Sequence, residues 1–343
     1  MKKQVLVTGG VGYIGSHTVV ELQNEGFEVF IVDDLSNSNI EVLDRIEKIT
    51  GIRPHFEQFD LCDRAKVQEY FQKHDGLEAI IHFAASKAVG ESVEKPLLYY
   101  RNNLVSLMNL LEAMDQYNVP SIVFSSSCTV YGQPEVLPVT ENAPVQEATS
   151  PYGNTKQMCE EILFDSISAF AGGVRGIALR YFNPIGAHAS AEIGELPVGV
   201  PQNLVPYITQ TGAGLREQLS IFGDDYDTAD GTAVRDYIHV VDLAKAHVVA
   251  IRRLMEHNNK KPLEFFNIGT GNGLTVLQLV KAFEKVTGVK LNYKLVDRRA
   301  GDIEKVWADT TFANEELGWK AQSTVEETLA SAWAWEKKIR NID

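Results

Sequence analysis

The segment QVLVTGGVGYIG, residues 4–15, decides the fold of this chain. Its first five residues, Gln4–Thr8, are mostly apolar, which predicts a short buried strand. Glycines stand at positions 9, 10, 12 and 15, and an amphipathic segment then runs to about Gly26, which predicts a helix. Glycines at this spacing let backbone N–H groups and a helix N-terminus approach a pyrophosphate without obstruction by a Cβ atom. The segment predicts a nucleotide-binding turn, although an ordinary tight turn between strand and helix leaves a similar pattern.

An acidic residue follows the next strand at the position where a dinucleotide fold binds ribose. Residues 28–32 predict a second strand that ends in Asp33 and Asp34, about 20 residues after the glycine-rich turn. Asp33 can accept hydrogen bonds from the ribose hydroxyls of an adenosine, whereas its carboxylate would repel a 2′-phosphate. The sequence therefore predicts NAD rather than NADP as the cofactor.

Strands and helices alternate through the first half of the chain. Further strands are predicted at residues 54–59, 79–83, 121–126 and 176–180, and long helices at 95–117 and 152–170. This alternation is typical of an α/β fold with a doubly wound parallel sheet, a Rossmann domain, which we assign to residues 1–182. The later pattern is looser and richer in Gly and Pro. It predicts a smaller α+β substrate-binding lobe over 183–343, with a helix near 240–257 that can pack back on the first domain.

Tyr152 and Lys156 form the candidate catalytic pair. Ser150 is a typical helix cap, and Pro151 suits the first helical position. In such a helix Tyr152 and Lys156 lie on one face, with Cβ atoms about 5–6 Å apart, and the ammonium is expected to lower the pKa of the phenol. Ser127 follows the predicted strand 121–126, where its hydroxyl can share a proton with Tyr152. The spacing alone also fits a surface tyrosine and a solvated lysine.

Several other positions have two open interpretations. Asp60 and Leu61 follow the strand at 54–59, where the acid either contacts an adenine or caps the next helix. His82 is expected to be a packed strand histidine rather than a catalytic group. Arg235 and Arg299 can bind a diphosphate, because guanidinium groups suit phosphate oxygens, or they can form surface ion pairs.

Composition limits the class of protein. The 343 residues are 44% hydrophobic and 23% charged, a balance typical of a globular chain. A net charge of −14 argues against nucleic acid or an anionic membrane surface as a partner, and we find no apolar segment long enough to span a membrane. The cysteines, Cys62, Cys128 and Cys159, do not have the spacing of metal ligands. We therefore expect a cytoplasmic location and no metal.

Longer strings connect these motifs to a known family. They are VTGGVGYIGSHT (7–18), KAVGESV (87–93), SPYG (150–153), LRYFNP (179–184) and VRDYIHV (234–240). Together they resemble the extended short-chain dehydrogenase/reductase superfamily and, more closely, the UDP-glucose 4-epimerases. The resemblance covers nearly the whole chain.

The resemblance implies an isomerase that interconverts UDP-glucose and UDP-galactose with a bound NAD. Tyr152 would take the proton of the sugar 4-hydroxyl while a hydride leaves C4, Ser127 would share the proton, and Lys156 would hold the nicotinamide ribose. The 4-keto sugar would then rotate and receive the hydride on its opposite face. The resemblance also implies a homodimer in which helices 95–117 and 152–170 form a four-helix bundle with their copies.

Binding residues carry over from the family position by position. The cofactor would be lined by Gly9, Gly12, Tyr13, Ile14, Gly15, Asp33, Asn37, Asp60, Leu61, Phe83, Ala84, Lys87, Asn102, Tyr152 and Lys156. The UDP-sugar would be bound by Ser127, Asn183, Asn203, Phe222, Arg235, Arg299, Asp302 and Val306.

Two positions refine the expected reaction. Dehydratases and decarboxylases of the superfamily usually carry acids after the catalytic Ser or Thr, whereas this chain has Cys128 and Thr129, which favours epimerisation. Cys128 itself is expected to be a packed thiol. Epimerases limited to UDP-glucose and UDP-galactose tend to carry Tyr before the position of Trp307. The smaller Val306 predicts a pocket that also accepts UDP-GlcNAc and UDP-GalNAc, unless backbone shifts close it.

Two other functions stay open. An epimerase of another UDP-sugar, such as a pentose or a uronate, would carry similar motifs, although a uronate needs an extra cation for its carboxylate. A catalytically silent NAD-binding regulator would be expected to have lost Tyr152 or Lys156, and both are present.

Overall fold

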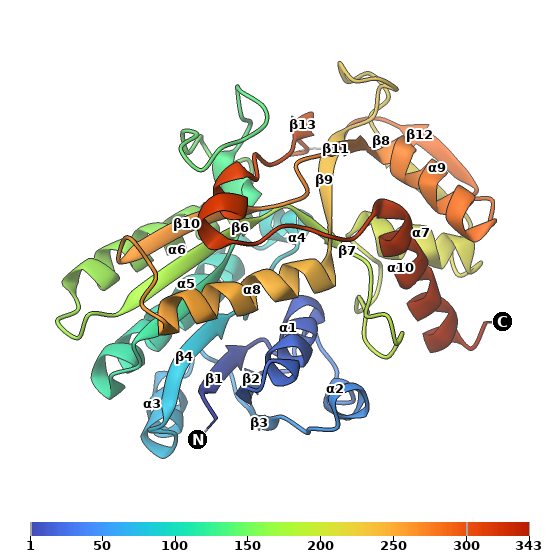
Figure 1. Ribbon diagram of the computed structural model, residues 1–343. Helices are drawn as coiled ribbons and strands as arrows, with labels where there is room; N and C mark the ends of the chain where they lie inside the picture. Colours follow the sequence, from blue (N-terminus) through green and yellow to red (C-terminus); the bar gives the residue numbers. More distant parts are fainter. Residues whose placement is uncertain (1, 300, 343) are drawn as a thin grey trace.

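The glycine-rich segment begins with β1 (Gln4–Thr8), an inner strand of a seven-stranded parallel sheet (Figure 1). The computed structural model describes residues 2–299 and 301–342. The other strands of this sheet are β2 (Glu28–Asp33), β3 (His55–Gln58), β4 (Leu77–His82), β5 (Ser121–Ser127), β6 (Arg175–Tyr181) and β10 (Leu263–Ile268). Their order is β10-β6-β5-β4-β1-β2-β3, and each neighbouring pair is parallel. The predicted doubly wound sheet is confirmed.

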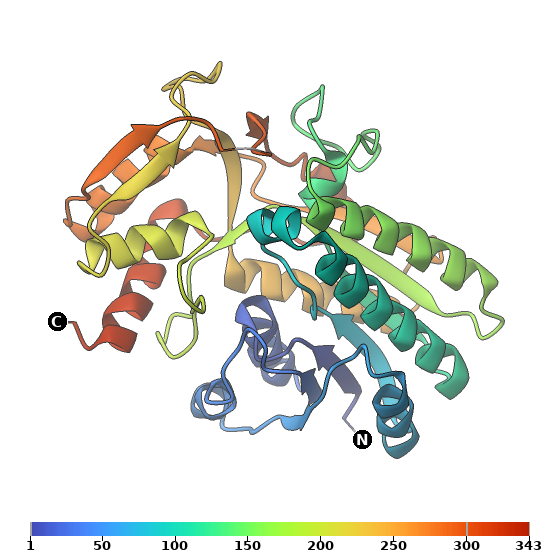
Figure 2. The same cartoon turned by 180° about the vertical axis from the view of Figure 1, so that it is seen from behind.

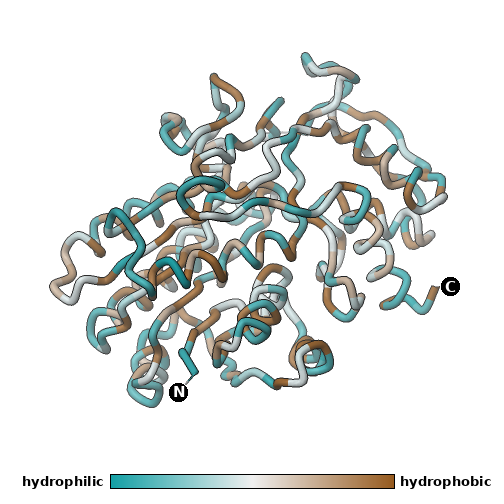
Figure 3. The backbone as a smooth tube through the Cα atoms, viewed as in Figure 1, coloured by the Kyte–Doolittle hydropathy of each residue, from teal (hydrophilic) through white to brown (hydrophobic). Residues whose placement is uncertain are grey.

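Helices cover both faces of the sheet because successive strand residues point to opposite sides. Val5 and Val7 of β1 enter one apolar core, whereas Leu6 enters the other. The first core is covered by α1 (Tyr13–Asn24), α2 (Val42–Thr50) and α8 (Val240–Met255). The second is covered by α3 (Arg64–Lys73), α5 (Pro96–Tyr117) and α6 (Pro151–Ala169), which are seen in Figure 2. Apolar and polar segments alternate along α8 (Figure 3), as expected for a helix with one buried face.

A smaller lobe lies beside the carboxyl edge of the sheet, at the upper right of Figure 1. It contains α7 (Leu204–Gly212), β8 (Leu219–Phe222), α9 (Val276–Thr287), β12 (Tyr293–Val296) and α10 (Val325–Arg340). β8 and β12 form a parallel pair. Ile208, Ile221, Phe283 and Leu329 are buried in its own apolar core. The lobe therefore has α+β character, as the sequence predicts.

A third sheet joins the two parts of the molecule. Its strand β9 (Val234–His239) pairs with β7 (Asn183–Ile185), β11 (Gly273–Thr275) and β13 (Lys305–Val306). The buried carboxylate of Asp236 on β9 accepts hydrogen bonds from the backbone N–H groups of Thr270, Gly271 and Ala308. β9 thereby holds two later segments of the chain beside the site. The remaining helical segments are α4 (Val89–Glu94) and two short turns, Cys128–Tyr131 and Ala313–Leu317.

Two segments from the second half of the chain lie on the first sheet. β10 pairs with β6 from Leu263 opposite Gly176 to Ile268 opposite Tyr181. α8 packs beside α1 and contributes ten buried residues. The division at residue 182 stays a prediction about contiguous domains. Within the described residues, no helix is long and apolar enough to cross a membrane.

Candidate active site

The carboxyl ends of β1, β4 and β5 meet at one edge of the sheet, where ligands of open α/β folds bind. The glycine-rich turn follows β1, Phe83 and Ala84 follow β4, and Ser127 ends β5. The N-terminus of α6, which carries Tyr152, packs against the turn that follows Ser127. The structure therefore brings the predicted cofactor turn and the predicted catalytic residues to the same edge.

The glycine-rich turn lies too close to its neighbours for side chains. Gly9 has a φ of +70°, and a Cβ atom there would stand 2.8 Å from the backbone nitrogen of Ala84. A Cβ on Gly15 would stand 2.2 Å from the carbonyl oxygen of Gly9. Gly12 precedes α1, so Tyr13 and Ile14 begin that helix. This backbone cradle with an adjacent helix N-terminus fits a pyrophosphate.

Asp33 is held at the end of β2 beside this turn. Its carboxylate accepts hydrogen bonds from the N–H of Val11 (3.3 Å), the N–H of Leu35 (3.0 Å) and the hydroxyl of Ser38 (2.9 Å). Burial raises the pKa of Asp33, and these donors oppose the rise by favouring the charged form. A fixed carboxylate in this place is suited to accept ribose hydroxyls. Asn37 lies exposed in the loop after β2.

A second group of predicted cofactor residues lies at the end of β3. The Asp60 carboxylate accepts a hydrogen bond from the N–H of Cys62 (2.8 Å), and the Cys62 thiol lies 3.7 Å from the carbonyl of Asn102. Leu61 is buried. Asp63 caps α3 instead of Asp60, because its side chain accepts from the N–H of Lys66. The alternative interpretation of Asp60 as the helix cap is therefore wrong.

The helix that carries Tyr152 begins as the sequence predicts. The Ser150 hydroxyl accepts a hydrogen bond from the N–H of Gly153 (3.1 Å), and Pro151 occupies the first turn. Lys156 is buried, and its Nζ donates to the carbonyl of Ser125 (2.6 Å). The same Nζ lies 5.9 Å from the centre of the Tyr152 ring. The interpretation of Tyr152 and Lys156 as a surface tyrosine and a solvated lysine is wrong, since one is half-buried and the other buried.

The pKa of Tyr152 differs from the expectation. Desolvation by burial raises it well above the ordinary value, the neighbouring Tyr181 phenol adds to the rise, and a hydrogen bond with the Ser127 hydroxyl opposes it. Burial also lowers the pKa of Lys156 to about 8. The expectation that Lys156 makes the phenol acidic is therefore wrong for the chain alone. Burial removes water from both the phenol and the amine, so it shifts the equilibrium of each group toward its uncharged form.

Two predicted residues from distant segments, Lys87 and Asn203, meet at the carboxylate of Glu195. The amide of Asn203 donates to Glu195 (2.5 Å), and the Nζ of Lys87 lies 3.5 Å from the same oxygen. Lys87 also lies 5.8 Å from the centre of the Tyr13 ring, whose hydroxyl donates to the carbonyl of Gly186. This contact links predicted cofactor residues to a predicted substrate residue. Sequence reasoning missed Glu195, because nothing in a loop rich in Gly and Pro distinguishes its carboxylate.

Arg235 is a cation without a carboxylate partner among the residues that the structure describes. Its guanidinium donates to the backbone carbonyls of Val234 (2.8 Å), Ile303 (2.7 Å) and Glu304 (3.3 Å). The surface ion-pair interpretation is therefore wrong for Arg235. Val306 pairs directly with it across β13 and β9, and is only 1% exposed.

Arg299 forms a surface ion pair, which was the alternative interpretation for this residue. The ion pair lies beside other predicted site residues. The Arg299 guanidinium contacts the carboxylate of Asp302 at 2.7 Å and lies 5.7 Å from the centre of the Phe222 ring. Asn183 on β7 is half-buried and pairs with Tyr237 of β9. Strand pairing thus places three predicted substrate residues, Asn183, Arg235 and Val306, in the β9 sheet.

His82 is a packed histidine, as predicted. It is buried, and its Nδ1 lies 2.7 Å from the hydroxyl of Thr8. Phe83 contacts another buried histidine, His247, with ring centres 4.6 Å apart. No cluster of three or more potential metal ligands occurs in the described ranges 2–299 and 301–342.

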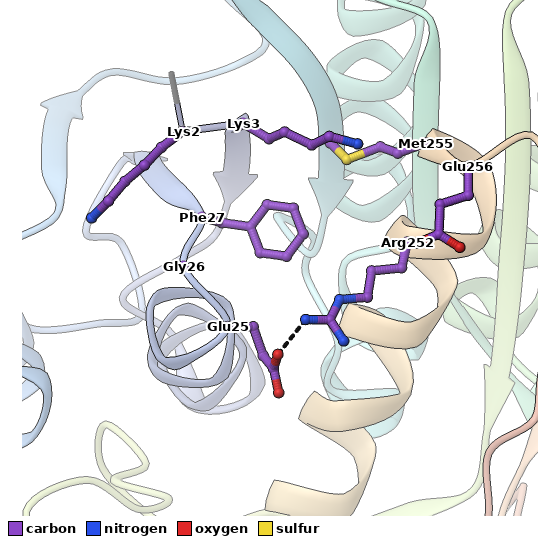
Figure 4. Close-up of a pocket in the computed structure, with 8 residues that line it drawn as sticks. All are labelled: Lys2, Lys3, Glu25, Gly26, Phe27, Arg252, Met255 and Glu256. Atoms are coloured by element: carbon purple, nitrogen blue, oxygen red, sulfur yellow. Dashed lines mark hydrogen bonds and ion pairs between the residues drawn. The ribbon is translucent and has the colours of Figure 1, made fainter.

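A surface pocket of about 420 Å³ lies at the opposite edge of the sheet (Figure 4). It is lined by Lys2, Lys3, Glu25, Gly26, Phe27, Arg252, Met255 and Glu256. Lys3 and Phe27 precede β1 and β2, so this is the amino edge, and Arg252 is already paired with Glu25. The pocket contains none of the predicted site residues. Ligand binding is therefore better sought at the carboxyl edge.

Comparison with known proteins decides the family. A family model described as GDP-mannose 4,6 dehydratase matches residues 6–332. The UDP-glucose 4-epimerase of Bacillus subtilis is 53% identical over 338 residues, which are 98% of this chain and 98% of that protein. This chain belongs to the UDP-glucose 4-epimerases. It is therefore an isomerase, and the predicted family is confirmed.

Solved structures of the epimerases agree in fold. A UDP-glucose 4-epimerase from Stenotrophomonas maltophila, crystallised with bound NAD and formylated UDP-arabinopyranose, has a TM-score of 0.95 and 47% identity, and covers 99% of this chain and 100% of that chain. A UDP-Glc/GlcNAc 4-epimerase from Campylobacter jejuni has a TM-score of 0.83 and 36% identity, and covers 98% and 99% of the two chains.

The cysteines near the site should react slowly. Burial raises the pKa of Cys62 to about 11 and that of Cys128 and Cys159 to about 12, so thiolate forms only near those pH values. At pH 8 we expect alkylation by iodoacetamide to be about 10²-fold slower for Cys62, and about 10³-fold slower for Cys128 and Cys159, than for free cysteine, with rates that still rise above pH 9. The urea-unfolded chain should react at the ordinary rate. Fast alkylation of folded Cys128 at pH 8 would contradict its description as a packed thiol.

Proposed function

We propose that this protein interconverts UDP-glucose and UDP-galactose by oxidation of the sugar at C4, rotation of the 4-keto sugar and reduction on the opposite face. The observation that carries the proposal is the shared edge of the glycine-rich turn, Ser127 and the Tyr152–Lys156 helix. The turn and Asp33 fit the pyrophosphate and ribose of NAD, the cofactor of this family member. NAD, when bound, accepts a hydride from C4 and returns it.

Tyr152 is proposed as the group that takes and returns the proton of the 4-hydroxyl. Its hydrogen bond with Ser127 supports a shared proton, because two hydroxyls in contact can pass one between them. A positive charge beside the phenol is needed to offset the burial that raises its pKa, and oxidised NAD carries such a charge. Lys156 is proposed to donate to the ribose of the nicotinamide half, while its carbonyl contact with Ser125 fixes its position.

Arg235 is proposed to bind the diphosphate of the UDP-sugar. Its guanidinium donates only to neutral carbonyls among the described residues, so an anionic ligand supplies the charge that it lacks. Arg299, Asp302 and Phe222 lie together and are proposed to contact the UDP-sugar, to which Asn183 and Asn203 are proposed to donate. The proposed division into a cofactor domain and a substrate lobe corresponds to the proposed NAD-binding residues and the proposed UDP-sugar-binding residues.

The size of Val306 supports a broader sugar site that also accepts UDP-GlcNAc and UDP-GalNAc. Val306 packs in a buried cluster with Phe182 and Ala308, against which Cys128 also packs. One epimerase of this family is described as acting on UDP-Glc and UDP-GlcNAc. An epimerase of another UDP-sugar and a silent NAD-binding regulator stay as alternative hypotheses.

A homodimer is proposed on the outer faces of α5 and α6. These helices pack side by side at the surface (Figure 2) and carry exposed apolar side chains: Leu97 is 76% exposed, Met108 41% and Phe164 58%. Leu97 and Met108 are three helical turns apart, so they lie on one face. A second copy would bury this apolar face and form a four-helix bundle. A cytoplasmic location stays a prediction from cysteine usage.

Replacing the catalytic hydroxyl tests the chemistry. We expect Tyr152→Phe to lower kcat for UDP-glucose by about 10²–10⁴-fold, because the proton acceptor is lost while the ring is kept. Product sugars and kcat are measured by chromatography, with Tyr117→Phe at the far end of α5 as the control. Wild-type turnover by Tyr152→Phe would contradict the assignment. A purified wild-type protein that forms no product would favour the silent regulator.

The breadth of the sugar site is tested with four UDP-sugars. We expect the wild-type protein to interconvert UDP-GlcNAc and UDP-GalNAc, and Val306→Tyr to lose this activity about tenfold or more while UDP-glucose turnover is kept. Val306→Ile adds one methylene and serves as the matched control. Failure on both N-acetylated sugars by a protein active on UDP-glucose would refute the broader site.

The oligomeric state is tested by light scattering. We expect a mass about twice 38.1 kDa for the wild-type chain and a monomer for Leu97→Glu/Phe164→Glu, because charges in the apolar face oppose its burial. Val136→Glu, which is 74% exposed in a distant loop, should stay a dimer. A monomeric wild-type chain at micromolar concentration would rule out this interface.

A further inference from the structure

We propose that Glu160 is a positioning residue, which holds β5 against α6 so that Ser127 and Lys156 keep their places beside Tyr152. The inference rests on the roles proposed above for these three residues. Glu160 lies one helical turn after Lys156, is only 6% exposed, and has no part in the proposed chemistry itself.

Three consecutive residues of β5 meet three successive turns of α6. The carbonyl of Ser125 accepts from Lys156 (2.6 Å), the hydroxyl of Ser126 donates to Glu160 (2.5 Å), and the hydroxyl of Ser127 contacts Tyr152. Ser125 meets α6 only through its backbone carbonyl, because its hydroxyl pairs with Tyr181 of β6, whereas Ser126 contacts the middle of α6 through its side chain. The contact between Ser126 and Glu160 therefore sets the position of the strand along the helix, on which the other two contacts depend.

A second strand completes the arrangement. Arg180 of β6 pairs directly with Ser126 of β5, and its guanidinium donates two hydrogen bonds to Glu160, at 2.9 and 2.6 Å. The guanidinium also lies 5.0 Å from the ring centre of Tyr131 and 4.6 Å from that of Phe265. A two-point contact with a carboxylate fixes orientation as well as distance. Glu160 thus ties the catalytic helix to two adjacent strands.

The carboxylate also bears on the charge of Lys156. Burial lowers the pKa of Lys156 to about 8, and the neighbouring Cys159 thiol and the Glu160 carboxylate on the same helix oppose this lowering. From β4, His82 faces Lys156, and Tyr152 lies one turn before it. Removal of the Glu160 charge is expected to lower the pKa of Lys156 further, because the carboxylate no longer stabilises the ammonium. The ammonium is then lost at a lower pH, so the alkaline side of the activity profile should move down.

Two conservative variants separate position from charge. Ser126→Ala removes one hydroxyl and leaves every charge in place. We expect it to lower kcat about tenfold or more with little change in KM, because small misplacements at a reacting centre are costly. Glu160→Gln keeps the shape and removes the charge. We expect it to move the alkaline limb of kcat to lower pH by about half a unit or more.

Ser168→Ala, on an exposed turn of the same helix, is the matched control and should behave as wild type. If Glu160→Gln fails to fold, Glu160→Gln/Arg180→Met removes both charges and is used in its place. Folding is checked by circular dichroism, and NAD content by absorbance. Wild-type kcat in Ser126→Ala together with an unmoved alkaline limb in the folded charge variant would overturn the inference. Because Tyr152→Phe tests the chemistry separately, loss of activity in Tyr152→Phe alongside both of these results would refute only the role of Glu160.

Discussion

The close approach of the β1–α1 turn to the end of β4 is the constraint on which the site depends. Gly9 nearly touches Ala84, and Gly15 nearly touches Gly9, so two segments that begin far apart in sequence share one backbone surface. Side chains are excluded there, and N–H groups remain available to a ligand. Asp33 reaches the same surface from β2. The placement of Ser127 two strands away follows from the parallel order of the sheet.

A chain with a net negative charge can bind an anionic nucleotide only through individual basic side chains at the site. Lys156 stands among buried groups, Lys87 is shared with Glu195, and Arg235 is surrounded by carbonyl dipoles. The three cations have different partners, so their positive charges are offset to different extents before a ligand binds. Arg235 has the greatest charge to offer, because no carboxylate of the described chain pairs with it. Binding specificity can therefore arise without a positive surface.

Local signals predicted much of the fold and the place of the candidate catalytic residues in it. β1 and β5 each contain three consecutive apolar residues, and the Ser150 cap fixes the phase of α6, so the cap together with the spacing predicted that Tyr152 and Lys156 lie on one face of that helix. β10 was missed because Glu264 and Asn267 interrupt its pattern. Glu264 is paired with Arg253 on α8, and Asn267 is bonded to Tyr131. Such partners, like the burial that raises the pKa of Tyr152, exist only after the chain has folded.

The direct continuation of β9 into α8 limits how the molecule can move. His239, the last residue of β9, caps α8 by accepting from the N–H of Val241, and α8 is buried against the first sheet. Opening the small lobe as a hinged lid would pull that apolar helix face into water, at about 25 cal/mol for each Å² exposed. Rotation of the lobe is therefore costly, and movement at the site needs less energy in surface loops, such as the one that carries Glu195. A few side-chain contacts in such loops would then control access to the site. The two halves of the molecule would stay in fixed alignment while the keto sugar rotates.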